Sequence, residues 1–465
     1  MALIFKQFVT EAIGDASYLV GDDSARVVAV IDPQVDIQQY VEAAREYGVA
    51  ITHVVQTHIH EDFVSGATAL AKASGGAEVC VGGHDAPSYG FEHRLVMNGQ
   101  VLELGNVLLT VKHTPGHTPE HISLLVAKKD KKDAPFAVLS GGSLLVGAAG
   151  RTDLLGQERV DELTQAQFNS LRECFLSLDD GVQVYPTHVH GSPCGAAIGD
   201  KTSTTIGYER RNNELLQQAD GSSFRAAALE NLPPKPRYYP RIKERNTASQ
   251  PREAPSTAIQ PLPPANFQKA MSAGNTVVVD TRHLLAFGGA HVQGALNIGA
   301  TGHLSIWSGW MLEPDQPLLL VLDSDAKLNV VAAHLARTGF ELFAGYLVGG
   351  MSSWENAGLP LQTLRQLHVA EAAKESEQGL LTLLDVRSPQ EWMKGHAPGA
   401  RHIFLPELPS RLGELSKGQR FAVYCDSGYR ASIGASLLQA RGFDVGNIPG
   451  SWQAWMACEL PVEKD

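Results

Sequence analysis

Cysteine is scarce and long apolar runs are missing from this chain of 465 residues. Its five cysteines are an odd number at scattered positions, which argues against a disulfide framework and favours reduced thiols. No stretch approaches the roughly 20 consecutive apolar residues that a membrane helix needs, and the first residues lack the basic start and long apolar core of a signal peptide. We therefore expect a cytoplasmic protein that does not enter a membrane.

Basic side chains are too few to form a face that binds nucleic acid. The 38 Lys and Arg residues stand against 50 Asp and Glu residues, and the net charge of −12 would repel a phosphate backbone. The length suggests three domains at about 150 residues per domain. The composition therefore argues against nucleic acid as a partner and favours a globular multidomain protein.

The most informative stretch covers residues 54–66 and reads VVQTHIHEDFVSG. His58, His60 and Asp62 occupy every second position after an apolar start, which is typical of a buried strand that ends in a ligand-rich loop. Neutral imidazole nitrogens and carboxylate oxygens are common ligands of divalent metals. The stretch therefore predicts a metal site.

Two further histidine clusters follow predicted strands. Residues 113–121 read HTPGHTPEH, where proline and glycine shape a loop that can aim His117 at a fixed point. Residues 185–191 read YPTHVHG and add His188. Three such clusters in one domain are hard to explain as chance, since each alone can supply a metal ligand.

Taken together, the three clusters resemble those of the metallo-β-lactamase superfamily, over residues 1–246. That resemblance implies an αββα fold. The segments 149–154 (AGRTDL) and 231–236 (NLPPKP) are similar to segments of the persulfide dioxygenase branch. This branch implies one Fe(2+) per chain, held by His58, His117 and an aspartate.

The expected aspartate is missing from this chain. The corresponding loop, residues 139–145, reads LSGGSLL, so that Gly142 stands where the carboxylate should be. Two neutral imidazoles offset none of the charge of a divalent ion, so iron should bind weakly and Gly142→Asp should raise its occupancy. The additional candidates are His60, Asp62, Asp153 and His188 for the metal, and Arg151, Tyr185 and Arg387 for substrate contacts.

Two alternatives for this domain stay open. The first is a metal-poor, inactive scaffold or thiol-binding module in a chain that acts only as a sulfurtransferase, and Gly142 is the reason for it. The second is a thioester hydrolase of the glyoxalase II type that uses zinc. That family usually has a histidine for a second metal where this chain has Phe63, which disfavours a dinuclear hydrolase.

An internal repeat follows a segment rich in Pro, Arg, Lys, Ser and Thr. The composition predicts a linker from Lys235 to about Pro264, and we assign its part up to about residue 256 to the first domain. After it, the segments VVVDTR and HVQGALNI recur about one hundred residues later as LLDVR and HAPGARHI. The copies resemble rhodanese domains, which implies two α/β units over residues 257–364 and 365–465.

The second copy contains a loop that resembles the rhodanese active site, CDSGYR over residues 425–430, between an apolar strand and a helix. Backbone N–H groups at a helix N-terminus, with Arg430 nearby, stabilise an anion and lower the pKa of a thiol. We therefore expect Cys425 to carry sulfane sulfur as the catalytic residue. The loop residues expected to cradle that sulfur are Asp426, Ser427, Gly428 and Tyr429.

The first copy lacks this chemistry. Its equivalent loop, residues 323–328, reads DSDAKL and has neither cysteine nor arginine. We interpret the first copy as a degenerate rhodanese with a structural or docking role.

The sequence thus predicts an α/β multidomain protein with a metallo-β-lactamase fold followed by two rhodanese-like domains. The resemblance implies oxidation of a low-molecular-weight persulfide, such as glutathione persulfide, to sulfite, and transfer of sulfane sulfur through Cys425. Thiosulfate, sulfite and small thiols are the implied partners, with Zn(2+) as the alternative metal. Fusions of this kind often dimerise, so a homodimer is a further expectation.

Overall fold

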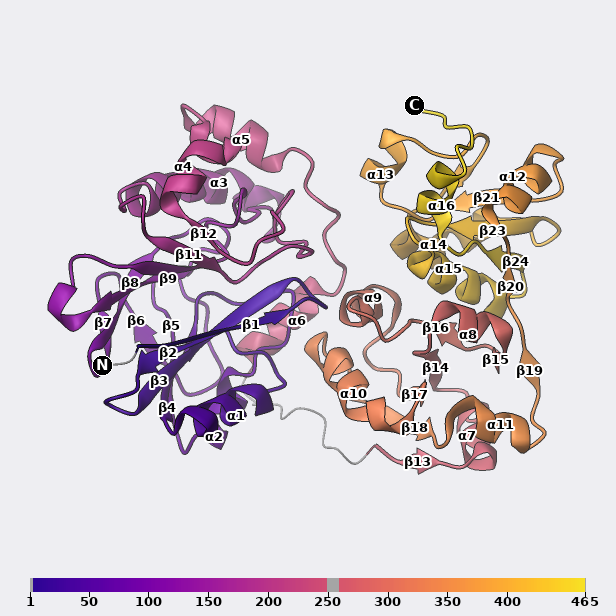
Figure 1. Cartoon of the computed structure of the whole chain (residues 1–465), viewed down its shortest axis with the longest axis horizontal. Helices are drawn as coiled ribbons and strands as arrows, with labels where there is room; N and C mark the ends of the chain where they lie inside the picture. Colours follow the sequence, from indigo (N-terminus) through magenta and orange to yellow (C-terminus); the bar gives the residue numbers. More distant parts are fainter. Residues whose placement is uncertain (1–2, 249–258, 465) are drawn as a thin grey trace. The chain divides into compact units, whose positions relative to one another are not determined.

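The computed structural model describes residues 3–248 and 259–464. Contacts within the chain define two compact units, which are coloured along the sequence in Figure 1. The first unit is Met1–Ala254 with Ala336–Gly339, and the second is Pro255–Leu335 with Phe340–Asp465.

The segment expected to be a linker is partly helical. Residues 239–247 form helix α6 (Tyr239–Thr247), so this part of the prediction was wrong. Residues 249–258 lie outside the described part of the chain. Among the helices of residues 3–248 and 259–464, none combines the length and apolar content needed to cross a bilayer.

Two six-stranded sheets form the first unit. The first sheet has the order β1-β2-β3-β4-β5-β6, with bounds β1 Leu3–Thr10, β2 Asp15–Asp22, β3 Val27–Ile31, β4 Ala50–Gln56, β5 Glu78–Gly82 and β6 Arg94–Val96. The second has the order β12-β11-β10-β9-β8-β7, with bounds β7 Val101–Leu104, β8 Val107–His113, β9 Ile122–Lys128, β10 Ala137–Gly141, β11 Gln183–Pro186 and β12 Thr204–Thr205.

The two sheets pack face to face with helices outside them. One apolar cluster joins side chains of both sheets, such as Tyr18 from β2 and Leu124 from β9. A second cluster joins the first sheet to helices α1 (Gln38–Tyr47) and α2 (Ala67–Ala73). A third cluster covers the other sheet with side chains from the helices α3 (Val160–Ser170), α4 (Ile206–Asn212) and α5 (Gly221–Leu229). These layers confirm the predicted αββα fold.

Helix α1 illustrates how local sequence sets an element. The sequence predicts a helix from about Ile37 to Tyr47 that ends at Gly48, and the structure confirms both ends to within one residue. Gly48 has φ 65°, a left-handed conformation that glycine adopts at little cost. Its N–H donates to the carbonyl oxygens of Ala44 and Arg45, so the last turn is closed.

The second unit contains two five-stranded sheets in which every neighbouring pair is parallel. The first has the order β13-β18-β17-β14-β16, with bounds β13 Pro261–Leu262, β14 Val277–Asp280, β16 Leu296–Asn297, β17 Leu318–Val321 and β18 Phe343–Leu347. The second has the order β20-β24-β23-β21-β22, with bounds β20 Arg365–Gln366, β21 Thr382–Asp385, β22 Arg401–His402, β23 Arg420–Tyr424 and β24 Asp444–Asn447. The same strand order in both sheets is the structural form of the repeat.

Helices and one small ribbon complete this unit. Strands β15 (His291–Val292) and β19 (Leu361–Gln362) pair with each other. The helices are α7 Pro264–Ser272, α8 Leu284–Gly289, α9 Leu304–Met311, α10 Leu328–Arg337, α11 Gly350–Asn356, α12 Val369–Glu377, α13 Pro389–Lys394, α14 Leu408–Arg411, α15 Tyr429–Ala440 and α16 Ser451–Ala457. A single apolar cluster contains residues of both copies, including Leu320 from β17 and Phe421 from β23, so the copies share one core.

Candidate functional site

Three histidines from separate strand ends meet in the first unit. His58 follows β4, His117 follows β8 and His188 follows β11. Their rings are buried, and one nitrogen from each lies within 4.8 Å of the others. The Nε2 atoms of His58 and His188 are 3.3 Å apart. The loops that the sequence singled out therefore converge on one point.

Neighbouring groups fix which nitrogen of His58 and His117 is free. Thr57 Oγ1 donates to Asp32 Oδ2 at 2.8 Å, so it must accept from Nδ1–H of His58, which is also 2.8 Å away. Nδ1–H of His117 donates to the carbonyl oxygen of Arg151 at 2.8 Å. Each ring thus keeps the lone pair of Nε2 for a ligand.

His188 is held in the same way by carboxylates. Its Nδ1 lies 2.7 Å from Asp15 Oδ1 and 3.1 Å from Asp62 Oδ2. With Nδ1–H donated to these oxygens, Nε2 is the nitrogen that faces the other two rings. Metal-binding histidines in proteins usually have their second nitrogen fixed in this manner, so the three Nε2 atoms fit a metal ion well.

Burial and the mutual repulsion of imidazolium charges oppose protonation of two of these rings. Burial, and then the neighbouring histidines, hold the pKa of His58 well below its usual value, and burial with His188 lowers that of His117 to about 3. For His188 burial acts in the same direction, but Asp62 and Asp15 outweigh it and raise the pKa to about 10. The carboxylates therefore favour a positive charge at His188, which is either a proton on Nε2 or a metal ion that displaces this proton.

His60 lies next to the three rings, with its ring centroid 4.3 Å from that of His58. Its Nε2 is 3.1 Å from Asp32 Oδ1. Within the described residues its buried Nδ1 has no hydrogen-bond partner. The ring stacks on Phe63 at 4.2 Å, so a side chain that cannot bind metal fills the adjacent space.

Gly142 does not leave a gap beside the histidines. An added Cβ at this residue would lie 2.4 Å from Cδ2 of His117, and its N–H donates to Nε2 of His121 at 2.8 Å. The His117 ring is held by Arg151, so it cannot easily move aside. The expectation that Gly142→Asp adds a ligand is therefore revised, because the space for that carboxylate is occupied by an imidazole.

The loop that follows β23 in the second unit directs a backbone N–H at the sulfur of Cys425. Strand β23 ends at Tyr424, and helix α15 begins at Tyr429. Cys425 is buried, and the N–H of Gly428 donates to its sulfur at 3.1 Å. Gly428 has φ 103°, a conformation that a side chain would strain. The sulfur thus faces the N-terminus of a helix of 12 residues.

Arg430 is paired more tightly than the sequence suggests. Its guanidinium makes two hydrogen bonds to Glu391, at 2.6 and 2.7 Å. Burial opposes the charge of Arg430, but Glu391 and then Cys425 raise its pKa. The guanidinium is therefore close enough to Cys425 to interact with it electrostatically, while Glu391 fixes its direction.

Comparisons with known proteins match the same segments. The metallo-β-lactamase superfamily model matches residues 14–130, and the rhodanese-like domain model matches residues 263–357 and 368–458. The chain joins a metallo-β-lactamase domain to tandem rhodanese-like domains.

Individual relatives each match a part of the chain. The mitochondrial persulfide dioxygenase ETHE1 of Bos taurus is 25% identical over 219 residues, which cover 47% of this chain and 77% of that protein. A probable metallo-hydrolase of Burkholderia pseudomallei (strain 1710b) is 27% identical over 246 residues, covering 45% and 80%. A crystal structure of a metallo-β-lactamase from Staphylococcus aureus subsp. aureus COL has a TM-score of 0.67 and 29% identity, and covers 75% of this chain and 99% of that one.

The other residues predicted to contact metal or substrate in the metallo-β-lactamase domain have structural partners elsewhere in the domain. Asp153 makes two hydrogen bonds to the guanidinium of Arg151, at 2.7 and 2.8 Å. Arg151 also donates to the carbonyl oxygens of Pro193 and Pro233, so its guanidinium ties segments of the domain together. Tyr185 packs in an aromatic cluster with Phe5 and Tyr18.

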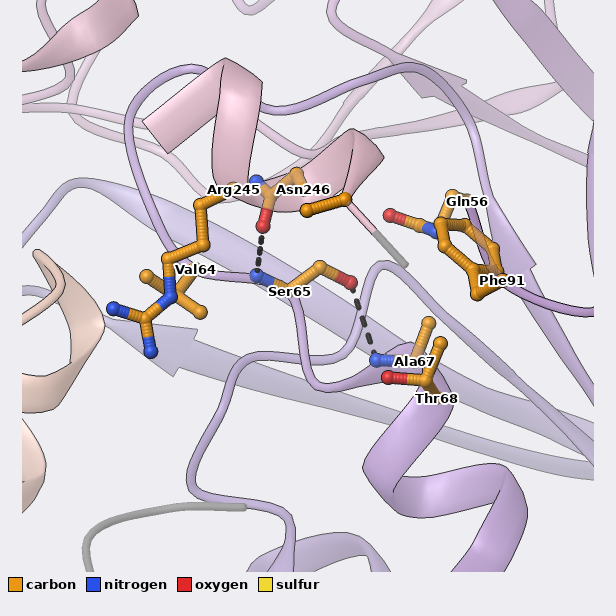
Figure 2. Close-up of a pocket in the computed structure, with 9 residues that line it drawn as sticks. Gln56, Val64, Ser65, Ala67, Thr68, Phe91, Arg245 and Asn246 are labelled. Atoms are coloured by element: carbon orange, nitrogen blue, oxygen red, sulfur yellow. Dashed lines mark hydrogen bonds between the residues drawn. The ribbon is translucent and has the colours of Figure 1, made fainter. Parts of the chain in front are cut away.

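Asn246 holds the loop that carries the metal-site residues, although no local pattern in the sequence predicts this role. Its Nδ2 donates to the carbonyl oxygens of His60 and Phe63 at 2.8 Å each, and its Oδ1 accepts from the N–H of Ser65 at 2.9 Å. Figure 2 shows the bond to Ser65, with Asn246 projecting from α6. The adjoining cavity, which Asn246 helps to line, has a volume of only about 30 Å³, so we interpret Asn246 as a clamp for the loop.

Arg387 in the second rhodanese-like domain is also an internal tether. Its guanidinium bonds Asp385 at 2.6 Å and lies 4.3 Å from the ring centroid of Trp452. Arg282 and Asp280 make the same 2.6 Å contact in the first domain. The Asp-x-Arg segment therefore stabilises the fold of each copy.

The loop of the first rhodanese-like domain is closed by its own side chains. Both carboxylate oxygens of Asp325 accept from the N–H of Gly349, each at 3.2 Å. A carboxylate thus takes up a backbone donor at this loop, and no sulfur is present. The copy instead contacts helix α15 of its neighbour: Ser432 Oγ donates to Asn297 Oδ1 at 2.6 Å, and Tyr429 Oη donates to the carbonyl oxygen of Gly299 at 2.9 Å.

Proposed function

We propose that the metallo-β-lactamase domain oxidises a low-molecular-weight persulfide and that the second rhodanese-like domain transfers sulfane sulfur. The observation that carries the first activity is the convergence of three imidazole lone pairs, which is compatible with one metal ion. Phe63 fills the position next to His60 and supports a mononuclear site. The similarity to a persulfide dioxygenase supports the substrate class.

His58, His117 and His188 would hold a ferrous ion, because imidazole suits iron and three protein ligands leave positions open. When bound, the iron supplies activation of O2 and a binding position for the persulfide sulfur. Thr57 and the carbonyl oxygen of Arg151 keep two of the rings in the tautomer that binds metal. With glutathione persulfide as substrate, the reaction is RSSH + O2 + H2O giving RSH, HSO3⁻ and H⁺.

In the second activity, Cys425 attacks the outer sulfur of thiosulfate. The S–S bond breaks, sulfite leaves with the electron pair, and Cys425 becomes a persulfide. A small thiol then takes up the outer sulfur and restores Cys425. The N–H of Gly428 stabilises negative charge on the cysteine sulfur, and the helix N-terminus acts in the same direction.

Metal analysis and two rate assays test this proposal. We expect about one iron per chain, O2 uptake that depends on glutathione persulfide, and sulfur transfer from thiosulfate. His58→Ala should remove iron and O2 uptake and leave sulfur transfer unchanged. Absence of O2 uptake by an iron-loaded protein would overturn the oxidative function.

A thioester hydrolase with zinc is the second candidate. The similarity to a probable metallo-hydrolase favours it. The buried Nδ1 of His60, which has no hydrogen-bond partner among the described residues, also favours it as a further nitrogen that can bind zinc. Zinc in the purified protein, together with turnover of lactoylglutathione and no O2 uptake, would support the hydrolase. If the protein binds neither metal and still transfers sulfur, the sulfurtransferase activity is the one that remains of those proposed.

A further inference from the structure

The three histidines are neutral donors, and the position that would supply an anionic ligand is Gly142. A divalent ion held only by neutral groups in a buried site lacks charge compensation, which is costly in a medium of low dielectric constant. Negative charge close to the site must therefore come from elsewhere if the site is to hold its ion tightly.

Two carboxylates lie directly behind His188. Asp15 is the first residue of β2 and Asp62 belongs to the loop after β4, so they come from separate parts of the domain. Both are buried, at 0% and 1% exposure, and both approach the same nitrogen, His188 Nδ1. Two carboxyl groups at one imidazole nitrogen exceed what is needed to orient the ring. Burial and the adjacent Asp62 hold the pKa of Asp15 well above its usual value, so the pair carries roughly one negative charge, as the missing aspartate would.

Asp62 has spare capacity as an acceptor. Its Oδ1 is buried and, in the described part of the chain, has no hydrogen-bond partner. Its Oδ2 contacts His188 and the thiol of Cys194, which lies 3.6 Å away. Burying an ionised carboxylate with so few partners is unfavourable unless a cation is nearby.

We propose that Asp15 and Asp62, acting through His188, replace the missing carboxylate of position 142. On the proposed function, which this inference assumes, the metal centre is a three-histidine site whose negative charge lies one hydrogen bond further out. The carboxylates draw the Nδ1 proton toward themselves and make Nε2 of His188 a stronger donor, and their charge attracts the ion directly. Asp15 and Asp62 are thus positioning residues for the metal.

Binding of Co²⁺ and Fe²⁺, measured by competition with a chelator, tests this assignment. Asp15→Asn and Asp62→Asn keep an oxygen that can accept from His188, so each takes one ionisable carboxyl group from the pair with little change of shape. We expect each to weaken binding of both ions by about 10–100-fold. The visible spectrum of the Co²⁺ form should also change, because the donor strength of His188 falls; a role limited to folding would leave that spectrum unaltered.

Asp22→Asn is the matched control. Asp22 ends the same strand, is equally buried, and bonds Ser24 and Asn106. Its replacement should leave the metal affinity unchanged, and thermal unfolding of each variant checks the fold. Because Asp62 lies in a loop, Asp62→Asn provides a second variant if Asp15→Asn in the strand fails to fold.

The outcomes separate the two proposals. If the unmodified protein binds neither ion, the metal-dependent function fails. If it binds them and both Asn variants bind equally well, the role of Asp15 and Asp62 is wrong and the oxidative function stands. Weaker binding that also follows Asp22→Asn would show a general effect of buried charge and would likewise overturn this inference.

Discussion

At the scale of single residues, the chemistry depends on which atom of a side chain is left free. Three imidazoles each donate Nδ1–H to a neighbour and direct Nε2 at a common point, and the neighbours are a hydroxyl, a carbonyl oxygen and a carboxylate. At Cys425 a backbone N–H is directed at the sulfur. In both sites, neighbouring hydrogen-bonding groups that do not themselves react orient the reactive atom.

Cys425 should be the only cysteine required for sulfur transfer. Cys425→Ser should abolish transfer from thiosulfate to a thiol, because a hydroxyl at this position cannot form a persulfide. Cys458→Ser is the matched control, since Cys458 is free and exposed, and it should retain the wild-type rate. Transfer at the wild-type rate by Cys425→Ser would remove this residue from the mechanism.

Arg430 should act through both its charge and its fork of N–H groups. Arg430→Lys keeps the charge and loses the two-pronged contact with Glu391, so it should retain part of the activity. Arg430→Ala should lose more, by about 1–3 kcal/mol of barrier in sulfur transfer. Arg441→Ala, at the exposed end of the same helix, serves as control, and unchanged rates in both Arg430 variants would contradict the role.

Gly142→Asp should lower the metal content. The new Cβ clashes with the ring of His117, which a hydrogen bond to the carbonyl oxygen of Arg151 holds in place. The substitution should therefore displace the metal ligand His117, and the added carboxylate cannot compensate for this loss. Gly142→Ala adds the Cβ alone and should lower the metal content as well. Elemental analysis of both variants measures the effect, and a rise in iron with Gly142→Asp would restore the simpler interpretation of the sequence.

At the scale of elements, helices fix loops that lie far from them in the sequence. Helix α6 reaches back to the loop after β4 through Asn246, and α15 rests on the first rhodanese-like domain through Ser432 and Tyr429. These partners are far apart in sequence: Asn246 and His60 are separated by 186 residues. Loop geometry is therefore a property of tertiary packing.

Asn246→Ala should loosen the metal-site loop. It leaves the carbonyl oxygens of His60 and Phe63 and the N–H of Ser65 without their partner, so the free energy of unfolding should fall by about 1–3 kcal/mol. Chelator competition should show weaker metal binding. Asn212→Ala, an exposed residue of the same domain, is the control; equal effects on metal binding in both variants would argue against a clamp.

At the scale of the whole molecule, the sequence predicts the order of the folds well, because strand ends, glycine caps and repeated segments are local signals. The helix that ends at Gly48 and the loop that begins at Cys425 are examples. It predicts the metal site only in part. His188 stood among several candidates, and Asp15 was not among them, since 173 residues separate it from His188 and nothing local marks the contact.

The two rhodanese-like copies share one apolar core, so we expect each to depend on the other for stability. Leu320 and Phe421 belong to one apolar cluster, so separating the copies would expose apolar surface on each, at about 25 cal/mol per Å². We therefore expect the copy with no sulfur-carrying residue in its loop to stabilise the copy that has one. Deleting either copy should therefore leave the other poorly folded, whichever of them carries the reactive sulfur.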